Sequence, residues 1–271
     1  MVAFGNRTGV VVGLDGSAPV SAAVGWALEY ARCRHLPLRI IAADSARSRQ
    51  QRTLERRREL LDLTLLLCRS TVPSLPVSGS VTDDEIPDAL VTAAHASELV
   101  VVGSLSEALG GTSAIDLILA RAGCPVVVAR SARWPNPASP VVVGLDGSDA
   151  DDAPLSLAFD LAARTLAPLV GVHVRGEPVR RAVPCMTSSE RLRAWATKYP
   201  QVRVRHRVAG GGAVPALLGQ AKTAGMLVVG PAGPGGIVRR LVHEAACPVL
   251  VACGASDRTV ESVGARGEVR F

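Results

Sequence analysis

The chain has 271 residues, of which 48% are hydrophobic, and a formal net charge of +6 at pH 7. This apolar content can fill a core and excludes a wholly disordered chain. No apolar run approaches the roughly 20 residues of a membrane-spanning helix, and the opening letters MVAFGNRTG lack the pattern of a secretion signal. We therefore expect a soluble, cytoplasmic protein that makes no membrane contact.

Strand and helix patterns alternate along the first half of the chain. Apolar, β-branched runs predict five strands, at residues 9–14, 38–43, 75–81, 99–104 and 125–130. Apolar residues at helical spacing, with capping and breaking residues, predict helices between them, at residues 21–32, 49–69, 84–96 and 113–122. Continuous apolar strands alternating with helices are typical of an α/β fold with a parallel sheet covered on both faces.

The second half repeats the first. The octapeptide VVVGLDGS occurs at residues 10–17 and again at 141–148. LVVVGS at 99–104 corresponds to MLVVGP at 226–231, and CPVVVA at 124–129 corresponds to CPVLVA at 247–252. The offset falls from 131 to 127 to 123 residues, so the second copy has lost two short segments. We predict tandem domains at 1–135 and 136–253, and a disordered tail at 254–271.

The two copies are expected to pack against each other within one chain. WPNPASP at 134–140 has three prolines in seven residues and predicts a stiff linker. The fifth strand of each copy is an apolar edge, which would invite aggregation if it were exposed. We predict antiparallel pairing of Val126–Ala129 with Val249–Ala252, which gives an intramolecular pseudo-dimer. The sequence identifies no other protein partner.

Most of the excess positive charge lies in the second half, where 13 basic residues face 8 acidic ones in residues 136–253. VRVRHRV at 202–208 alternates apolar and basic residues, which places Arg203, Arg205 and Arg207 on one face of a strand. Charged side chains on an edge strand block unwanted pairing. With only 3% aromatic residues to stack on bases, we expect no specific nucleic-acid site, and any such binding should be weak and salt-sensitive.

The sequence contains little that predicts catalysis or metal binding. It has no phosphate-loop, dinucleotide-binding or nucleophile-elbow motif, and its five histidines lack metal-ligand spacing. None of the six cysteines forms a C-x-x-C pair. Cys124 and Cys247 each precede an apolar strand, where a small buried residue suffices as an explanation. We expect reduced thiols, no metal site and no enzymatic activity.

Taken together, VVVGLDGS at a domain start, a strand ending in VVGS, a glycine-containing loop and a CPVVVA strand resemble the universal stress protein family. The resemblance covers nearly all of residues 8–253. It implies an adenine-nucleotide alpha-hydrolase-like fold, with an open five-stranded sheet in the order 3-2-1-4-5 in each copy. It also implies ATP or another adenine nucleotide as a candidate ligand, since many members bind ATP and others do not.

This strand order opens a crevice outside the carboxyl ends of strands 1 and 4, where ligands bind in such sheets. The resemblance implies that Asp15 lies by the adenosine and that the backbone at Ala43 lies beside the adenine. It also implies that the loop after strand 4 holds the phosphates, because glycines allow close approach and a helix amino terminus attracts anions. The first copy offers six residues for this role: Gly103, Ser104, Gly110, Gly111, Thr112 and Ser113.

Both copies depart from the family's G-x-x-G pattern. In the first copy, Ser106 stands where the second glycine is expected, and the loop is about four residues short. The second copy keeps Gly233, but its loop is cut before Gly235 and no hydroxyl residue follows. We expect a ligand role for Asp15 and a turn-forming role for Asp146.

Two hypotheses remain. One is a regulatory module that binds an adenine nucleotide in the first copy only, where the short loop would favour a mono- or diphosphate. The other is a ligand-free interaction protein of the same fold, whose nucleotide pockets have degenerated.

Overall fold

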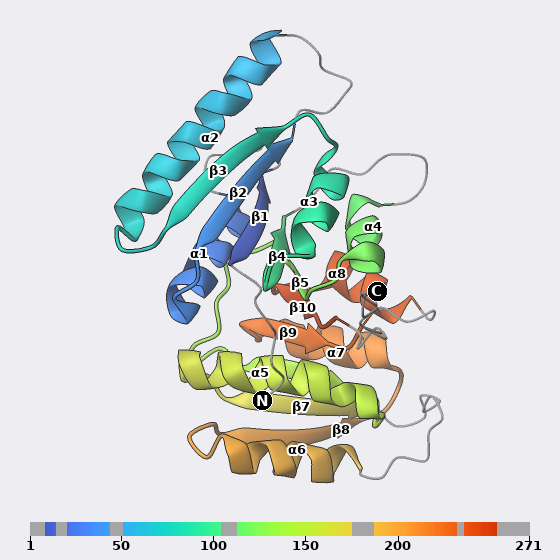
Figure 1. The fold of residues 1–271 in the computed structure, drawn as a ribbon. Helices are drawn as coiled ribbons and strands as arrows, with labels where there is room; N and C mark the ends of the chain where they lie inside the picture. The colour runs from blue at the N-terminus through green and yellow to red at the C-terminus, as the bar shows by residue number, and fades with distance from the viewer. Residues whose placement is uncertain are drawn as a thin grey trace, which may run out of the picture.

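The computed structural model describes residues 9–14, 21–43, 51–103, 113–174, 187–231 and 236–253, which form a ten-stranded sheet with helices on both faces (Figure 1). The strands of the first half are β1 (Val10–Leu14), β2 (Leu38–Ala43), β3 (Val77–Thr82), β4 (Leu99–Val102) and β5 (Val126–Val128). Its helices are α1 (Ala22–Arg34), α2 (Gln51–Thr71), α3 (Ile86–Ala94) and α4 (Ala114–Arg121). Strands and helices therefore alternate in the predicted order.

The second half repeats this order. Its strands are β6 (Val141–Leu145), β7 (Leu169–Val174), β8 (Val204–Ala209), β9 (Met226–Val229) and β10 (Val249–Val251). Its helices are α5 (Asp152–Thr165), α6 (Ser188–Lys198), α7 (Ala213–Ala221) and α8 (Ile237–Glu244). A 3-10 turn at Asp149–Asp151 leads into α5.

The strand order is β3-β2-β1-β4-β5-β10-β9-β6-β7-β8, so each half has the expected order 3-2-1-4-5. The two halves share one sheet and do not form two separate ones. They meet where β5 and β10 pair antiparallel, with Val127 opposite Leu250 at the centre. This pairing, which we call the seam, confirms the predicted pseudo-dimer contact. It gives each apolar edge strand a partner.

Each face of the sheet has its own hydrophobic core, and both cores run across the seam. Helices α1, α2, α5 and α6 cover one face, and α3, α4, α7 and α8 cover the other (Figure 1). Successive strand residues alternate between the two cores because side chains alternate along a strand. At the seam, Val127 and Leu250 therefore belong to the first core, while Val126 and Val251 belong to the second.

β8 is the last strand in the order, and its side chains are largely exposed. Arg203, Arg205 and Arg207 all face solvent, as the alternating pattern predicted. The opposite face is only partly covered, since Val208 is 49% exposed. The charged side chains thus lie on an edge strand, where they hinder pairing with another chain.

The linker between the halves packs tightly against its neighbours. The rings of Trp134 and Trp26 lie 5.2 Å apart between centroids, and the Asn136 side chain accepts two backbone N–H groups of the linker's turn. Gly225 donates its N–H to Pro140 at 2.9 Å. A methyl group added at Gly225 would lie 2.5 Å from the Cα of Pro135, so the contact involves backbone atoms that cannot move aside.

We therefore expect Gly225→Ala to lower the free energy of unfolding by about 1–3 kcal/mol, the usual cost of overpacking. The control is Gly219→Ala in α7, where an added methyl group meets nothing within 4 Å. That control should raise the free energy of unfolding by up to about 1 kcal/mol, because alanine favours helix. Urea denaturation measures both, and equal effects of the two variants would contradict the linker contact.

Candidate functional site

In the first half, three neighbouring parallel strands end at the same edge of the sheet. β1 lies between β2 and β4, so the carboxyl ends of all three meet there. Ala43 is the last residue of β2, and Gly103 follows β4 and is buried. The chain moves from β1 toward β2 but returns through β4 on the other side, which is the arrangement that leaves a crevice at this edge.

The amino end of α4 belongs to the same part of the fold. Ser113 is its N-cap residue, and its hydroxyl oxygen accepts the N–H of Ile115 at 3.2 Å. Asp116 in the first helical turn would repel an anion. Its carboxylate, however, pairs with the Nε atom of Arg239 in α8 at 3.0 Å. Arg239, from the second half, thus offsets the negative charge of Asp116 beside the crevice of the first half.

The structure places only part of the predicted site. Ala43, Gly103 and Ser113 lie at the ends of β2 and β4 and at the start of α4, as the sequence indicated. The other predicted site residues lie outside the described residues: Asp15, Ser104, Gly110, Gly111 and Thr112. The site therefore remains a prediction, of which the structure describes the flanking elements.

In the second half, the turn after β6 is held by its own side chains. The Asp146 carboxylate accepts the N–H of Ser148 at 2.8 Å, which is the turn-forming role expected for it. The Asp151 carboxylate accepts the N–H groups of Asp146 and Gly147, at 3.2 and 3.0 Å. The backbone donors that could face a ligand at this strand end are therefore already occupied.

Asp151 is 4% exposed, and its burial raises the pKa of its carboxyl group to about 7. The hydrogen bonds from the two backbone N–H groups and the nearby guanidinium of Arg191 act in the opposite direction. Arg191 comes from α6, is 6% exposed, and pairs with Asp149 and Asp152. A charge network, in which Arg191 and Asp151 are buried while Asp149 and Asp152 are exposed, thus joins the β6 turn to α6.

A histidine stands where the first half has a small residue. The 131-residue offset relates His173 at the end of β7 to Ala42. The Nδ1 atom of His173 lies 3.2 Å from the hydroxyl oxygen of Ser188 and 3.3 Å from the backbone oxygen of Leu145. The imidazole therefore occupies space at the edge where the resemblance would place an adenine ring in the first half.

Sequence reasoning missed the charge network of Asp149, Asp151, Asp152 and Arg191. The available signal was the comparison of the copies, since the second reads DGSDADD after its first strand where the first reads DGSAPVS. Three added carboxylates within four residues require cationic or hydrogen-bonding partners when they are buried. The sequence did not indicate that α6 provides the cation.

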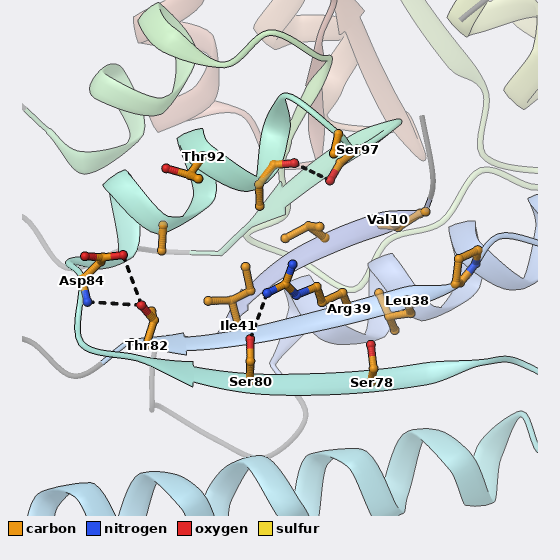
Figure 2. A pocket seen from close by; sticks show the side chains of 16 residues that line it. Val10, Leu38, Arg39, Ile41, Ser78, Ser80, Thr82, Asp84, Thr92 and Ser97 are labelled. Atoms are coloured by element: carbon orange, nitrogen blue, oxygen red, sulfur yellow. Dashed lines mark hydrogen bonds between the residues drawn. The ribbon is translucent and has the colours of Figure 1, made fainter. Parts of the chain in front are cut away.

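A separate groove of about 450 Å³ lies on the α3 face of the sheet, over β1, β2 and β3 (Figure 2). Val11 and Ile41 are among its apolar lining residues. Its polar lining residues bond within the groove: Arg39 donates to the Ser80 hydroxyl at 3.4 Å, and the Thr82 hydroxyl lies 3.3 Å from the Asp84 carboxylate. None of the three described site residues, Ala43, Gly103 and Ser113, lines this groove.

The two halves differ at this groove. Arg205 and Arg207 of β8 have the register positions that Ser78 and Ser80 of β3 have in the first half. The arginines are long enough to extend over the neighbouring strand, whereas the serines are too short. In the first half, the short side chains of Ser78 and Ser80 therefore leave the groove uncovered.

Two classes of site are absent from the part of the chain that the structure describes. No cluster of three or more histidine, cysteine or acidic side chains there could hold a metal ion. Of the helices in the described segments, none has the length and apolar character needed to cross a bilayer.

The doubly wound order, present twice and joined at the seam, defines a tandem α/β protein. No family model matches the sequence. The chain is 29% identical over 288 residues to the universal stress protein Rv2005c of Mycobacterium tuberculosis. The matched region covers 91% of this chain and 97% of that protein. The structure superimposes with a TM-score of 0.71 on a universal stress protein from Archaeoglobus fulgidus, at 14% identity and covering 93% and 98% of the two chains.

Over nearly its whole length, the chain is thus similar in sequence and in fold to tandem, two-domain universal stress proteins. Another universal stress protein from Archaeoglobus fulgidus was solved in complex with dAMP. It is 17% identical, covers 46% of this chain and 100% of its own, and has a TM-score of 0.38.

Proposed function

We propose that this chain is a regulatory module that binds an adenine nucleotide, ATP or a related one, in its first half only. The family resemblance supports the nucleotide, and the crevice at the carboxyl ends of β1 and β4 supports the place. Binding there would shift the protein between a free and a liganded state, and no bond would be made or broken.

The observation that carries the asymmetry is the engagement of the second half's turn by Asp151. A phosphate or ribose would compete with a carboxylate for the N–H groups of Asp146 and Gly147. As the pH rises past about 7, where Asp151 ionises, it would also meet the negative charge of that carboxylate at close range. By the 131-residue offset, the first half has Val20 where the second has Asp151, so its sequence offers no carboxylate at that position.

The amino ends of α4 and α8 support the same asymmetry. α4 begins after Ser113, whose hydroxyl oxygen caps the helix. α8 begins after Gly236, which has no side chain and adopts a left-handed conformation with φ of 67°. In the second half, Pro231 also lacks the N–H group that another residue would offer to a phosphate.

In the proposed complex, Asp15 contacts the adenosine and the backbone of Ala43 lies beside the adenine. The phosphates lie along the loop from Gly103 to Ser113, with Ser104, Gly110, Gly111 and Thr112 as further contacts, and face the amino end of α4. The short loop favours a mono- or diphosphate over a triphosphate. The alternative is a ligand-free interaction protein, which the departures from G-x-x-G favour.

Titration calorimetry with ATP, ADP and AMP tests the proposal on the full chain, on Asp15→Ala and on the matched variant Asp146→Ala. We expect one site per chain, lost in Asp15→Ala and kept in Asp146→Ala. Each charged hydrogen bond contributes roughly 1.5–3 kcal/mol, so the loss should reach about two orders of magnitude in affinity. Two equivalent sites would refute the asymmetry, and no heat with any nucleotide would favour the ligand-free alternative.

A further inference from the structure

Two cysteines from different halves lie at one end of the seam. Cys124 is two residues before β5, and Cys253 is two residues after β10. The seam pairs Val126 with Val251 and Val128 with Val249. Continued by two residues, the same antiparallel register places Cys124 opposite Cys253.

Hydrogen bonds at the strand ends support this continuation. The backbone oxygen of Pro125 accepts the N–H of Val100 at 3.1 Å. The chain is therefore still hydrogen-bonded to β4 at the residue before β5 begins. The N–H of Ala252 donates to the backbone oxygen of Val229 at 2.9 Å. The chain is therefore still hydrogen-bonded to β9 at the residue after β10 ends. Each strand therefore keeps its neighbour on the other side up to the residue next to its cysteine.

The two side chains face the same side of the sheet. Cys124 belongs to the core that also contains Val126 and Val251, as the alternation along the strands requires. The Sγ atom of Cys253 lies 3.9 Å from the backbone oxygen of Ala122, at the end of α4. Both cysteines line a cavity of about 490 Å³ between α4 and α8, which gives small molecules a route to them.

The repeat provides an internal comparison at the other end of the seam. Cys247 corresponds to Cys124, and the continued register places Arg130 opposite it. The guanidinium of Arg130 donates instead to the backbone oxygen of His243 at 2.7 Å. Burial raises the pKa of the Cys247 thiol to about 11, which makes it a poor nucleophile.

We propose that Cys124 and Cys253 are a modification site: a thiol pair that a hydroperoxide converts to a reversible disulfide joining the two halves. Opposite residues in antiparallel strands have Cα atoms about 4.5–5.5 Å apart, which lies within the range that a disulfide spans. Among the described cysteines, which carry no disulfide, this pair alone combines opposite positions with a shared cavity.

The chemistry balances in two steps. The half-buried Cys253 thiolate attacks one peroxide oxygen, the O–O bond breaks, and a sulfenic acid and one water or alcohol form. The Cys124 thiol then attacks that sulfur, the S–S bond forms and water leaves. Two thiols are oxidised and one peroxide is reduced, and a dithiol reductant reverses the result by exchange. The bond would fix the carboxyl end of α4 to β10 whether or not a nucleotide binds.

Peptide mapping of the reduced full chain after stoichiometric hydrogen peroxide tests the proposal. We expect the count of thiols in the unfolded chain to fall from six to four, and to return to six with dithiothreitol. Trypsin should release residues 122–130 joined to residues 241–258, without reduction. Because the second peptide also contains Cys247, the experiment is repeated on Cys247→Ser, which should still form the link.

Cys253→Ser should abolish the link, and Cys33→Ser, which changes another half-buried cysteine, should leave it intact. Circular dichroism establishes that each variant is folded. Cys253 is only half-buried, so its variant should fold even if Cys124→Ser does not. A link through Cys33 or Cys247, a link between two chains, or oxidation of Cys253 to sulfinic acid without a link would each overturn the proposal.

Discussion

Replacing Arg34 by methionine should lower the free energy of unfolding by about 2–4 kcal/mol. Arg34 ends α1, and its guanidinium pairs with Glu98 in the first half and with Asp160 in α5 of the second. The three side chains are only 22%, 14% and 25% exposed, so the carboxylates would lose a cation that water replaces incompletely. In the variant, Asp160 still pairs with a second cation, Arg164, at 3.0 Å. The expected loss of stability is therefore smaller than if both carboxylates were left without a cation.

Arg121→Met is the matched control, since Arg121 pairs with Asp88 at 3.0 Å while both side chains are more than half exposed. An exposed pair of this kind contributes about 0–1 kcal/mol. Urea denaturation at low salt compares the two variants. A loss no larger than that of Arg121→Met would contradict the role of Arg34 in joining the halves.

The architecture was predictable because it depends on patterns that are local and occur twice. VVVGLDGS at both domain starts marks β1 and β6, and the CPVVVA and CPVLVA runs mark the strands of the seam. An apolar edge strand present in two copies needs a partner, so the antiparallel pairing at Val127 and Leu250 could be stated in advance.

The contacts within the site were less predictable because they join segments that sequence patterns treat separately. Asp151 and Arg191 lie on different elements, and only the packing of α6 brings the guanidinium to the acidic turn. The approach of Gly225 to Pro135 also depends on where the linker lies in space. Periodicity places a residue on a face, but it does not identify the residue opposite.

The role of Asp151 should appear as a pH dependence of stability. Burial raises its pKa to about 7, far above the ordinary value of 3.8. Between these values the unfolded chain has lost the proton and the folded chain still holds it. The stability that this carboxyl group contributes is therefore present below about pH 4 and is lost as the pH rises toward 7.

Asp151→Asn cannot ionise, so it should gain stability relative to the parent as the pH rises from 4 to 7.5, by about 3–5 kcal/mol. Urea denaturation at closely spaced pH values measures this difference. Asp62→Asn makes the same change on the exposed surface of α2 and should follow the parent across the range. A constant difference between Asp151→Asn and the parent would mean that the hydrogen bonds from Asp146 and Gly147, together with Arg191, fully offset the cost of burial. The turn of the second half would then hold a permanent carboxylate, and anions would be excluded from it at every pH in this range.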